Sequence, residues 1–467
     1  MGVFLAALVL LLPNQGVGSL PNTDDAIYAQ MARELISSGD LLNNRWCGVI
    51  QFEKPPLLIW ALAASISAIG ETIFALRLPS TLAMATAAAA ITAILLALRA
   101  GPWRATLGAL LFLGSGLSMQ LGRRVMTDMP LVAMLLVAAA ALLAGRTTLM
   151  GVALGLALLT KGVAALPIGG LLGFVLIARL GWGKSLWTAV VALLVGLPWF
   201  LISTVQHGTE FLSATFGYHA IARAAGGVVP GLTAGELLDV LLLEWPLLLA
   251  FLAGAATLVR RTAFARTVTV SPDALPRKDL AIVIVWAVAA LVPPFASGTR
   301  LAHYLLPVMP LLALVAALGV PGAFLSSWPG RVGAAVLTAL LASVGPGTLA
   351  FWLNPELGAE LKVVGERLAA SRGDRLLALD LTNPSLTWSS GQCVPMVVTD
   401  ERFEEVQRAV LMNMRAGVVL DIEAGLGPSE RPRHVVYRLG AGAEPLLESI
   451  GLRPSPLTAN YGIATER

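Results

Sequence analysis

The first long polar stretch of the chain carries two pairs of charged residues that could do chemistry. Asp24 and Asp25 are adjacent, and Glu53 and Lys54 follow further along the same stretch. A carboxylate in a partly dehydrated cleft can accept a proton from a hydroxyl group or bind a divalent cation. A purely structural interpretation stays open, in which Thr23 caps a helix and the two acids complement its dipole. Two adjacent carboxylates followed by a Glu-Lys pair favour a site over capping alone.

Three more charged residues lie at the borders of apolar segments or inside one. Asp128 follows two arginines, so it could form a local ion pair at a helix end. Lys161 interrupts a long apolar run, and a buried lysine needs a partner or loses its proton. Arg300 could bind a phosphate through two hydrogen bonds, whereas the nearby His303 more simply packs at the interface. Lys54 has a similar structural alternative, in which its ammonium group extends to the membrane interface.

Most of the elements that must position these groups are predicted to be membrane-spanning helices. Of the 467 residues, 57% are hydrophobic and only 13% are charged, which is more apolar material than one soluble core could bury. The sequence predicts about eleven spans of the length a bilayer needs. They lie near residues 2–13, 73–97, 105–121, 129–144, 149–160 extending past Lys161, 163–178, 186–205, 233–259, 280–296, 303–320 and 332–352.

The distribution of charge predicts the orientation of these spans. With the N-terminus inside, eleven basic residues fall on the cytoplasmic side together with only two acids, Asp273 and Asp279. Cytoplasmic loops are enriched in Lys and Arg, so this orientation agrees with the usual rule. The first outer loop, residues 20–72, is then predicted to be extracytoplasmic, as is the tail that follows the last span.

Two amphipathic helices are predicted within the first outer loop. Ile27, Met31 and Leu35 recur every fourth residue while polar side chains take the opposite face, as in a helix lying in the membrane interface. Gly39 ends this helix. A second surface helix begins after two prolines and covers Leu57–Ala64.

Two domains are predicted, a transmembrane domain of residues 1–352 and a soluble extracytoplasmic domain of residues 353–467. The second holds fifteen of the 28 acids and no run long enough to span a bilayer. Glu404–Met414 is predicted to form a helix. Short apolar runs predict three strands, at Leu376–Leu379, Gly417–Leu420 and Val435–Tyr437. This pattern is typical of a small α/β domain.

The two cysteines, Cys47 and Cys393, lack the spacing of a metal site. Both fall in segments predicted to be extracytoplasmic. One candidate pair is weak support for a disulfide, so their pairing stays open.

A series of motifs runs along the predicted transmembrane domain. The motifs are Asp24–Glu34, Ser38–Asp40, Phe52–Leu57, Arg77–Ser80, Thr127–Leu131, Leu159–Gly162, Leu197–Phe200 and His303–Pro307. In this order, reaching to about residue 310, they resemble the bacterial aminoarabinose transferase and protein mannosyltransferase-like family. Members of this family are glycosyltransferases of the GT-C fold that use polyprenyl-phosphate sugars. The resemblance therefore implies an all-α polytopic membrane protein of the GT-C type, with the small α/β domain appended.

The resemblance implies catalytic roles for three acids. Asp24 would be the base or a cation ligand, Glu53 would help to orient the site, and Asp128 would lie beside the first-loop aspartate. A divalent cation held by Asp24, Glu53 and His219 is a candidate cofactor, although no tight ligand cluster is visible. The family usually has glutamate at the second acid, where this chain has Asp25, and the spacing around His219 is looser than in the family.

The resemblance also implies that Lys54, Lys161 and Arg300 bind the phosphate of the donor and neutralise it as it leaves. The expected reaction transfers a sugar from an undecaprenyl-phosphate carrier to lipid A, another glycan or a protein, with inversion at the anomeric carbon. The expected location is the bacterial inner membrane, with the active site and the tail on the periplasmic side. Membrane lipids are expected partners, and nucleic acid is not.

Two other functions stay open. A transporter or flippase of a lipid-linked substrate would share the spans and the intramembrane lysine, but repeated halves are not visible in the sequence. A non-catalytic scaffold whose tail binds a partner would keep its role if the first-loop acids were neutralised.

Overall fold

The computed structural model describes residues 1–20, 24–222, 231–264, 277–321, 324–325, 327–333, 359–369, 374–379, 384–397, 419–420 and 433–465. Contacts within the chain divide it into two units. The helical unit comprises Met1–Gln15, Arg77–Thr209 and His219–Leu353. The loop-and-sheet unit comprises Gly16–Leu76, Glu210–Tyr218 and Asn354–Arg467.

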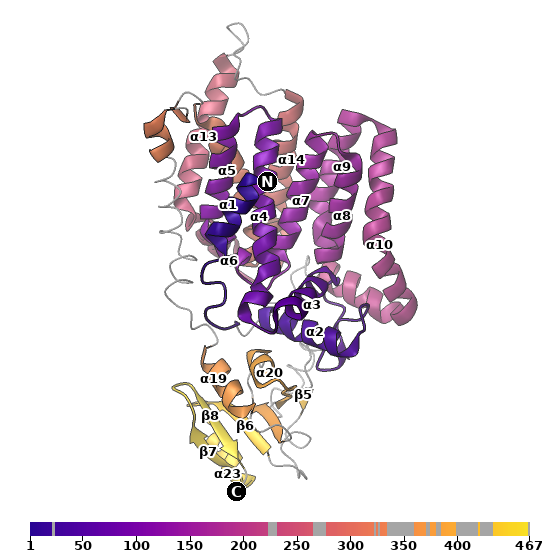
Figure 1. Cartoon of the computed structure of the whole chain (residues 1–467). Helices are drawn as coiled ribbons and strands as arrows, with labels where there is room; N and C mark the ends of the chain where they lie inside the picture. Colours follow the sequence, from indigo (N-terminus) through magenta and orange to yellow (C-terminus); the bar gives the residue numbers. More distant parts are fainter. Residues whose placement is uncertain are drawn as a thin grey trace. The chain divides into compact units, whose positions relative to one another are not determined.

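Long apolar helices make up most of the helical unit, and Figure 1 labels most of them. The helices are α1 (Gly2–Leu11), α4 (Ile73–Ala97), α5 (Pro102–Gly114), α6 (Gly116–Gly122), α7 (Asp128–Leu143), α8 (Thr147–Lys161), α9 (Leu166–Leu180), α10 (Trp182–Leu212), α12 (Ala234–Leu242), α13 (Trp245–Phe264), α14 (Arg277–Ala296) and α15 (Val308–Gly319). Short 3-10 turns, η1 (Gly162–Ala165) and η3 (Ala302–Leu305), precede α9 and α15, and a π-helix, η2 (Ser213–Ala222), follows α10.

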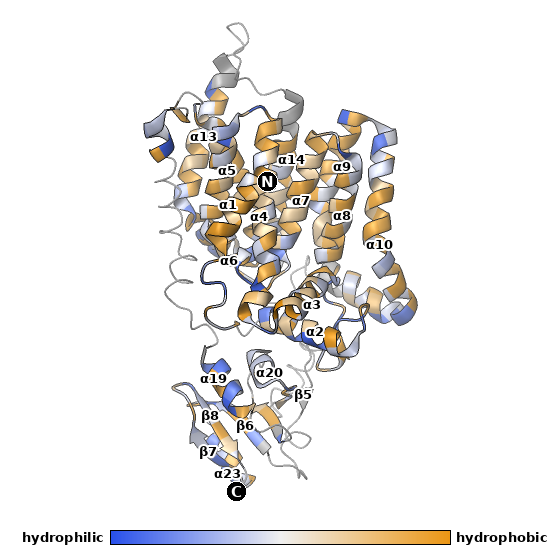
Figure 2. Cartoon of the chain, viewed as in Figure 1, coloured by the Kyte–Doolittle hydropathy of each residue, from blue (hydrophilic) through white to orange (hydrophobic). Residues whose placement is uncertain are grey.

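The helices agree with the predicted spans in position. Every predicted span up to residue 320 overlaps a helix or a bent helix pair, and α4 has the predicted bounds of 73–97. Figure 2 shows apolar residues along α4, α7, α8 and α9. By length and composition, 4 helices within the described residues could cross a membrane, or up to 6 if each bent pair is one span. Several other predicted spans correspond to apolar helices of 10–17 residues. The last predicted span, 332–352, lies almost entirely outside the described residues.

Two of the predicted spans are bent, and a residue at one bend stabilises the other bend. The chain turns by 71° between α5 and α6, and by 83° between α12 and α13. Glu244, 5% exposed, lies at the second bend, and its carboxylate accepts hydrogen bonds from the backbone N–H groups of Gly116 (3.2 Å) and Leu117 (2.6 Å). These donors belong to the first turn of α6, where no helical partner exists. One buried carboxylate therefore satisfies the helix start that the other bend creates.

Small residues allow several of the helices to approach closely. A Cβ at Gly151 would lie 2.7 Å from the carbonyl oxygen of Thr188, and one at Gly155 would lie 2.7 Å from that of Ala192. Gly319 of α15 lies against Gly254 of α13 in the same way. Helices in membranes gain little from hydrophobic burial, so close contact at small residues supplies much of their packing energy.

The loop-and-sheet unit contains the first outer loop and the tail. In the loop, α2 (Asp24–Ser38) and α3 (Leu57–Ile69) flank a hairpin of β1 (Arg45–Trp46) and β2 (Val49–Ile50). Both amphipathic helices predicted from the sequence are confirmed, and α2 ends before Gly39, whose φ of +70° suits a helix terminus. The tail contributes α19 (Ala359–Leu368), α20 (Pro384–Ser390), α23 (Glu444–Ser449) and a sheet.

The sheet has six strands in the order β5-β4-β3-β6-β8-β7. Its strands are β3 (Arg375–Leu379), β4 (Met396–Val397), β5 (Val419–Leu420), β6 (Arg433–Arg438), β7 (Arg453–Pro456) and β8 (Tyr461–Thr465). The first four in this order pair in parallel, and β8 pairs antiparallel with β6 and β7. The predicted strands at 376–379 and 435–437 are confirmed, as is the described part of 417–420. The predicted helix at 404–414 lies outside the described residues.

The central strands β3 and β6 contain continuous apolar runs because both faces of the sheet are buried there. Leu376 and Ala378 pack in one cluster with Val436, and Leu377 packs in the other with Val435. Parallel strands covered on both faces show such runs rather than an alternating pattern. The sequence pattern of the tail therefore follows from its topology.

A disulfide joins the first outer loop to the tail within this unit. Cys47 and Cys393 are bonded, with a Cα–Cα distance of 5.4 Å, which resolves the pairing that the sequence left open. Cys47 and Gly48 form the turn of the hairpin with φ values of +54° and +75°, as a type I′ turn requires. The carboxylate of Glu34 on α2 accepts hydrogen bonds from both of their N–H groups, at 2.7 and 2.9 Å. The turn and α2 therefore hold the disulfide in place.

Candidate active site

The two acids at the start of α2 differ in their surroundings. Asp25 is only 1% exposed, whereas Asp24 is half-buried and accepts a hydrogen bond of 3.4 Å from the hydroxyl group of Tyr28. Tyr28 lies one turn after Asp24, so the helix itself brings the two side chains together. Adjacent helical side chains diverge by about 100°, which separates the environments of the two acids. Asp24 is the more accessible carboxylate. Thr23, the alternative capping residue, lies outside the described residues.

Glu53 and Lys54 form a buried ion pair in the segment before α3. The Nζ of Lys54 lies 3.1 Å from Oε1 of Glu53, and both side chains are largely buried. Asn44 donates a hydrogen bond of 3.0 Å to the backbone carbonyl of Lys54, and Phe52 packs edge-on against Phe211 at 5.5 Å. A buried pair of this kind needs good geometry to offset the cost of dehydration. The segment is therefore held by contacts on both sides of the charged pair.

Asp40 orders the turn that follows α2. Its carboxylate accepts hydrogen bonds from the backbone N–H groups of Leu42 and Asn43 and from the guanidinium of Arg45. Burial acts to raise the pKa of Asp40, but the hydrogen bonds from Asn43, Leu42 and Arg45 outweigh it and lower the pKa. The turn is therefore stabilised by an ionised carboxylate above about pH 4, and this stabilisation is lost as the pH falls further.

The helical unit holds the second charged pair. The Nζ of Lys161 donates a hydrogen bond of 2.6 Å to Oδ1 of Asp128, and both side chains are largely buried. Asp128 begins α7 and Lys161 ends α8, and these two helices pack against each other. The ammonium group also lies 5.4 Å from the centre of the Tyr304 ring, a cation–π distance. The sequence required a partner for Lys161, and the structure provides Asp128.

The break after Lys161 has a local cause in the sequence. Gly162 adopts φ +57° and ψ −127°, which residues with a side chain rarely adopt. The chain can therefore leave α8 at Lys161 and continue into η1 and α9. Glycine at this position sets where the lysine side chain departs from the helix end.

Arg300 lies in the segment between α14 and η3. Its guanidinium donates two hydrogen bonds of 3.4 Å to the backbone carbonyl of Phe295, and its own carbonyl accepts one of 2.7 Å from Leu232. His303 packs edge-on against Tyr304 at 4.9 Å. Arg300 thus has an ordered position and a backbone partner.

The metal prediction is not resolved by the described residues. His219 lies in η2, and its side chain is outside the described part of the chain. Among the described residues, no group of three or more His, Cys, Asp or Glu is arranged to hold a metal ion. The cation proposed at Asp24, Glu53 and His219 therefore stays a prediction.

Two tyrosines contact predicted site residues but were not themselves predicted as site residues from the sequence. Tyr28 contacts Asp24, and Tyr304 contacts Lys161. Tyr28 follows Asp24 by four residues, so helical spacing could have indicated it. Tyr304 lies far from Lys161 in the sequence, and only the packing of the helical unit shows the contact.

Several known proteins named as glycosyltransferases are similar to this chain in sequence. A family model described as dolichyl-phosphate-mannose-protein mannosyltransferase matches residues 53–204. The undecaprenyl phosphate-alpha-4-amino-4-deoxy-L-arabinose arabinosyl transferase of Serratia proteamaculans is 28% identical over 340 residues. Its counterpart from Sodalis glossinidius is 30% identical over 344 residues. Each alignment covers 67% of this chain and 57% of the relative, so the chain spans a little over half of their length.

Solved structures extend the likeness to nearly the whole chain. ArnT from Cupriavidus metallidurans in the apo state has a TM-score of 0.74 at 18% identity. The same protein bound to undecaprenyl phosphate has a TM-score of 0.72 at 19% identity. Both comparisons cover 99% of this chain and 97% of the other. The chain is a relative of the aminoarabinose transferases and has their GT-C fold.

This relationship confirms the predicted fold class. The aminoarabinose transferase relatives and the apolar helices together identify a multi-pass membrane protein with a small sheet-containing region at its C-terminal end. The family model spans Glu53, Lys54, Asp128 and Lys161, which form the two buried ion pairs of the structure. Asp24 and Arg300 lie outside the segment that the model covers.

Proposed function

We propose that this protein is a membrane glycosyltransferase that moves a sugar from an undecaprenyl-phosphate donor to an acceptor such as lipid A, another glycan or a protein. The observation that carries the proposal is that the family model of a lipid-phosphate-dependent mannosyltransferase covers both buried ion pairs, Glu53 with Lys54 and Asp128 with Lys161. Curated relatives named as undecaprenyl-phosphate arabinosyl transferases support the same class of donor.

The proposed reaction is a single displacement at the anomeric carbon. A hydroxyl oxygen of the acceptor forms a new bond to this carbon, and the bond from the carbon to the phosphate oxygen breaks. The phosphate leaves with the bonding electron pair as undecaprenyl phosphate, and the hydroxyl proton passes to a carboxylate, for which we propose Asp24. One displacement inverts the configuration of the sugar. The half-buried position of Asp24 and its contact with Tyr28 suit a base that is accessible yet held in place.

Three cations are proposed to stabilise the phosphate as its charge develops. Lys54 and Lys161 each lie beside a carboxylate in a largely buried place, at 3.1 Å and 2.6 Å. Within the described residues, the guanidinium of Arg300 donates its hydrogen bonds to the backbone carbonyl of Phe295. Fixed positive charges aimed at the leaving group lower the barrier of the reaction. Glu53 and Asp128 then act by orienting Lys54 and Lys161.

The active site and the tail are proposed to face the periplasm of a bacterial inner membrane. A disulfide joins the first outer loop to the tail, and disulfides persist in oxidising compartments outside the cytoplasm. The low acid content of the predicted cytoplasmic loops supports the same orientation. We further propose that residues 1–352 form the transmembrane catalytic domain and residues 353–467 a soluble domain.

A transfer assay tests the proposed function. The purified chain is incubated with labelled undecaprenyl-phosphate sugars and a bacterial membrane extract, and the labelled product is identified by mass spectrometry. Transfer of label with release of undecaprenyl phosphate is expected, and movement of intact donor across vesicles without transfer would instead indicate a flippase. Repeating the assay after dialysis against EDTA, and again after adding Mg²⁺ or Mn²⁺, tests whether a cation at Asp24, Glu53 and His219 is required.

A further inference from the structure

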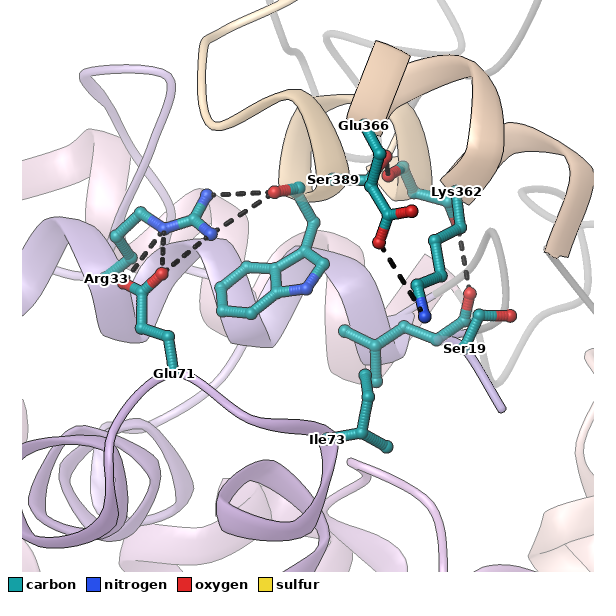
Figure 3. Close-up of a pocket in the computed structure, with 10 residues that line it drawn as sticks. Ser19, Arg33, Glu71, Ile73, Lys362, Glu366 and Ser389 are labelled. Carbon is teal, nitrogen blue, oxygen red and sulfur yellow. Dashed lines mark hydrogen bonds and ion pairs between the residues drawn. The ribbon is translucent and has the colours of Figure 1, made fainter. Parts of the chain in front are cut away.

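A polar pocket of about 270 Å³ lies within the loop-and-sheet unit, between the first outer loop and the tail. Figure 3 shows Arg33 and Glu71 at one end and Lys362, Glu366 and Ser389 at the other. The remaining lining comes from Ser19, Leu20, Ile73, Ser385 and Trp388. The volume is near the lower end of pockets that hold small molecules, roughly 300–1,000 Å³. None of these residues has a role in the proposed transfer reaction.

The charges in the pocket are balanced in pairs. The guanidinium of Arg33 bonds to both carboxylate oxygens of Glu71, at 3.1 to 3.3 Å, and Lys362 lies 3.7 Å from Glu366. Each cation is thus matched by an acid, so the pocket presents no net charge to attract an anion. Glu71 and Glu366 are exposed, and a carboxylate can accept several hydrogen bonds at once. The lining therefore suits a neutral ligand that donates many hydrogen bonds.

An aromatic ring, with Leu20 and Ile73, supplies the apolar part of the lining. Arg33 lies 3.8 Å above the ring of Trp388 and donates hydrogen bonds of 3.2 Å to its carbonyl, which fixes the indole in the wall. Serine hydroxyl groups, including those of Ser19 and Ser389, lie around it. A sugar ring has C–H groups on its faces that pack on an aromatic ring and hydroxyl groups on its rim that bond to acids and serines. Few other neutral ligands combine both features.

The approach of α19 to α20 fixes one wall of this pocket. A Cβ at Gly365 would lie 2.8 Å from Cβ of Ser389 and closer still to its hydroxyl oxygen. Ser389 in turn donates a hydrogen bond of 2.6 Å to the carbonyl of Ser385, and Ser385 donates one of 3.1 Å to the carbonyl of Leu20. The wall is therefore formed by the backbone and by packed side chains.

We propose that this pocket binds a sugar ring of the acceptor, at a distance from the ring that is modified. The proposal rests on the proposed function, because it assumes an acceptor of more than one sugar. Arg33 lies nine residues after Asp24 on α2, which is about 13.5 Å along the helix and on the opposite face. One sugar ring therefore cannot contact both Asp24 and Arg33. Binding a remote ring positions the acceptor and contributes binding energy to the reaction.

Binding of neutral disaccharides to the full-length chain tests the proposal. The protein is placed in lipid nanodiscs, since maltoside and glucoside detergents would present sugars of their own. Binding of cellobiose and of N,N′-diacetylchitobiose is measured by saturation-transfer NMR and by calorimetry. We expect at least one disaccharide to bind, and Trp388→Leu to weaken that binding by about tenfold or more. Trp103→Leu is the matched control, because Trp103 also stacks with an arginine, Arg331, but lines no part of the pocket.

A second variant guards against a folding defect in Trp388→Leu. Glu366→Gln keeps the shape of an exposed side chain and should weaken the same binding by about threefold. Failure of both disaccharides to bind, or wild-type affinity in both variants, would overturn the proposal. Undecaprenyl phosphate binding is measured on the same samples and should be unchanged in both variants. A wild-type chain that binds the disaccharide but not undecaprenyl phosphate would contradict the proposed function and leave the pocket as a sugar site.

Discussion

At the scale of single residues, Asp24 gives the sharpest test of the proposed chemistry. As a helix-terminal residue alone, Asp24 replaced by Asn would keep most of its effect, since Asn caps about as well as Asp. As the base, the same replacement removes the proton acceptor, and we expect transfer to fall by roughly 100-fold while the thermal unfolding midpoint barely changes. The measurement is the initial rate of sugar transfer by Asp24→Asn and by the wild type, with saturating donor and acceptor.

Asp25→Asn is the matched control for this experiment. Asp25 is adjacent but 1% exposed, so its replacement should affect stability more than the chemical step. Full transfer activity in Asp24→Asn would remove the proposed base. An equal loss of activity and of stability in both variants would favour a structural role for the pair.

Because Asp128 and Lys161 form a buried pair, substitutions at the two residues should have non-additive effects on stability. Asp128→Asn or Lys161→Met removes one member of the ion pair and leaves the other charge buried without this contact, which typically costs about 3–5 kcal/mol. The double variant leaves no such charge, so its loss of stability should be clearly smaller than the sum of the single losses. Thermal unfolding in detergent measures the stabilities, and affinity for undecaprenyl phosphate should fall whenever Lys161 is replaced. Additive losses of stability would contradict the ion pair.

At the scale of elements, the turn between α8 and α9 depends on one glycine. Gly162 has φ +57° and ψ −127°, so Gly162→Ala should cost about 1–3 kcal/mol and displace Lys161. Gly170 is the matched control, because it lies within α9 and a Cβ there would meet nothing within 4 Å. Gly170→Ala should leave stability unchanged or raise it slightly. Equal unfolding midpoints for the two variants would show that the turn tolerates a side chain.

The disulfide between the first outer loop and the tail should contribute to the stability of the loop-and-sheet unit. Its two cysteines are 346 residues apart in sequence, and Cys47→Ser should lower the free energy of unfolding of this unit by about 2–4 kcal/mol. Dithiothreitol should lower the unfolding midpoint of the wild type to about that of the variant, and it should have no effect on the variant. A variant that stays as sensitive to reductant as the wild type would contradict the bond.

At the scale of the whole molecule, the orientation in the membrane is the prediction with most consequences. Ser449→Cys places a thiol at an exposed position of α23, and Arg146→Cys places one in a predicted cytoplasmic loop. The native cysteines are bonded to each other, so each new thiol reports alone. In intact cells, with the outer membrane made permeable, a charged maleimide should label the Ser449→Cys variant and not the Arg146→Cys variant. Labelling of the Arg146→Cys variant instead would reverse the orientation and exclude a periplasmic active site.

Much of this architecture could be predicted because it depends on local composition. A helix such as α4 must be about 20 or more residues of apolar sequence to cross a bilayer, so its bounds are visible without any partner. Strands β3 and β6 contain the apolar runs Leu376–Leu379 and Val435–Tyr437 because both faces of the sheet are buried there. The bends next to Glu244 could not be predicted, since they depend on a carboxylate that meets a distant helix start.

The sequence by itself determined the membrane class, the amphipathic helices of the first outer loop and the types of residue in the site. Charges in apolar surroundings are rare enough to be conspicuous, and each must have a partner. Only the tertiary structure decided which partner each charge has. Lys161 forms an ion pair with Asp128 and a cation–π contact with Tyr304, and Cys47 forms a disulfide with Cys393. Residue types reflect the local cost of burial, whereas pairing depends on distances between segments that are far apart in the chain.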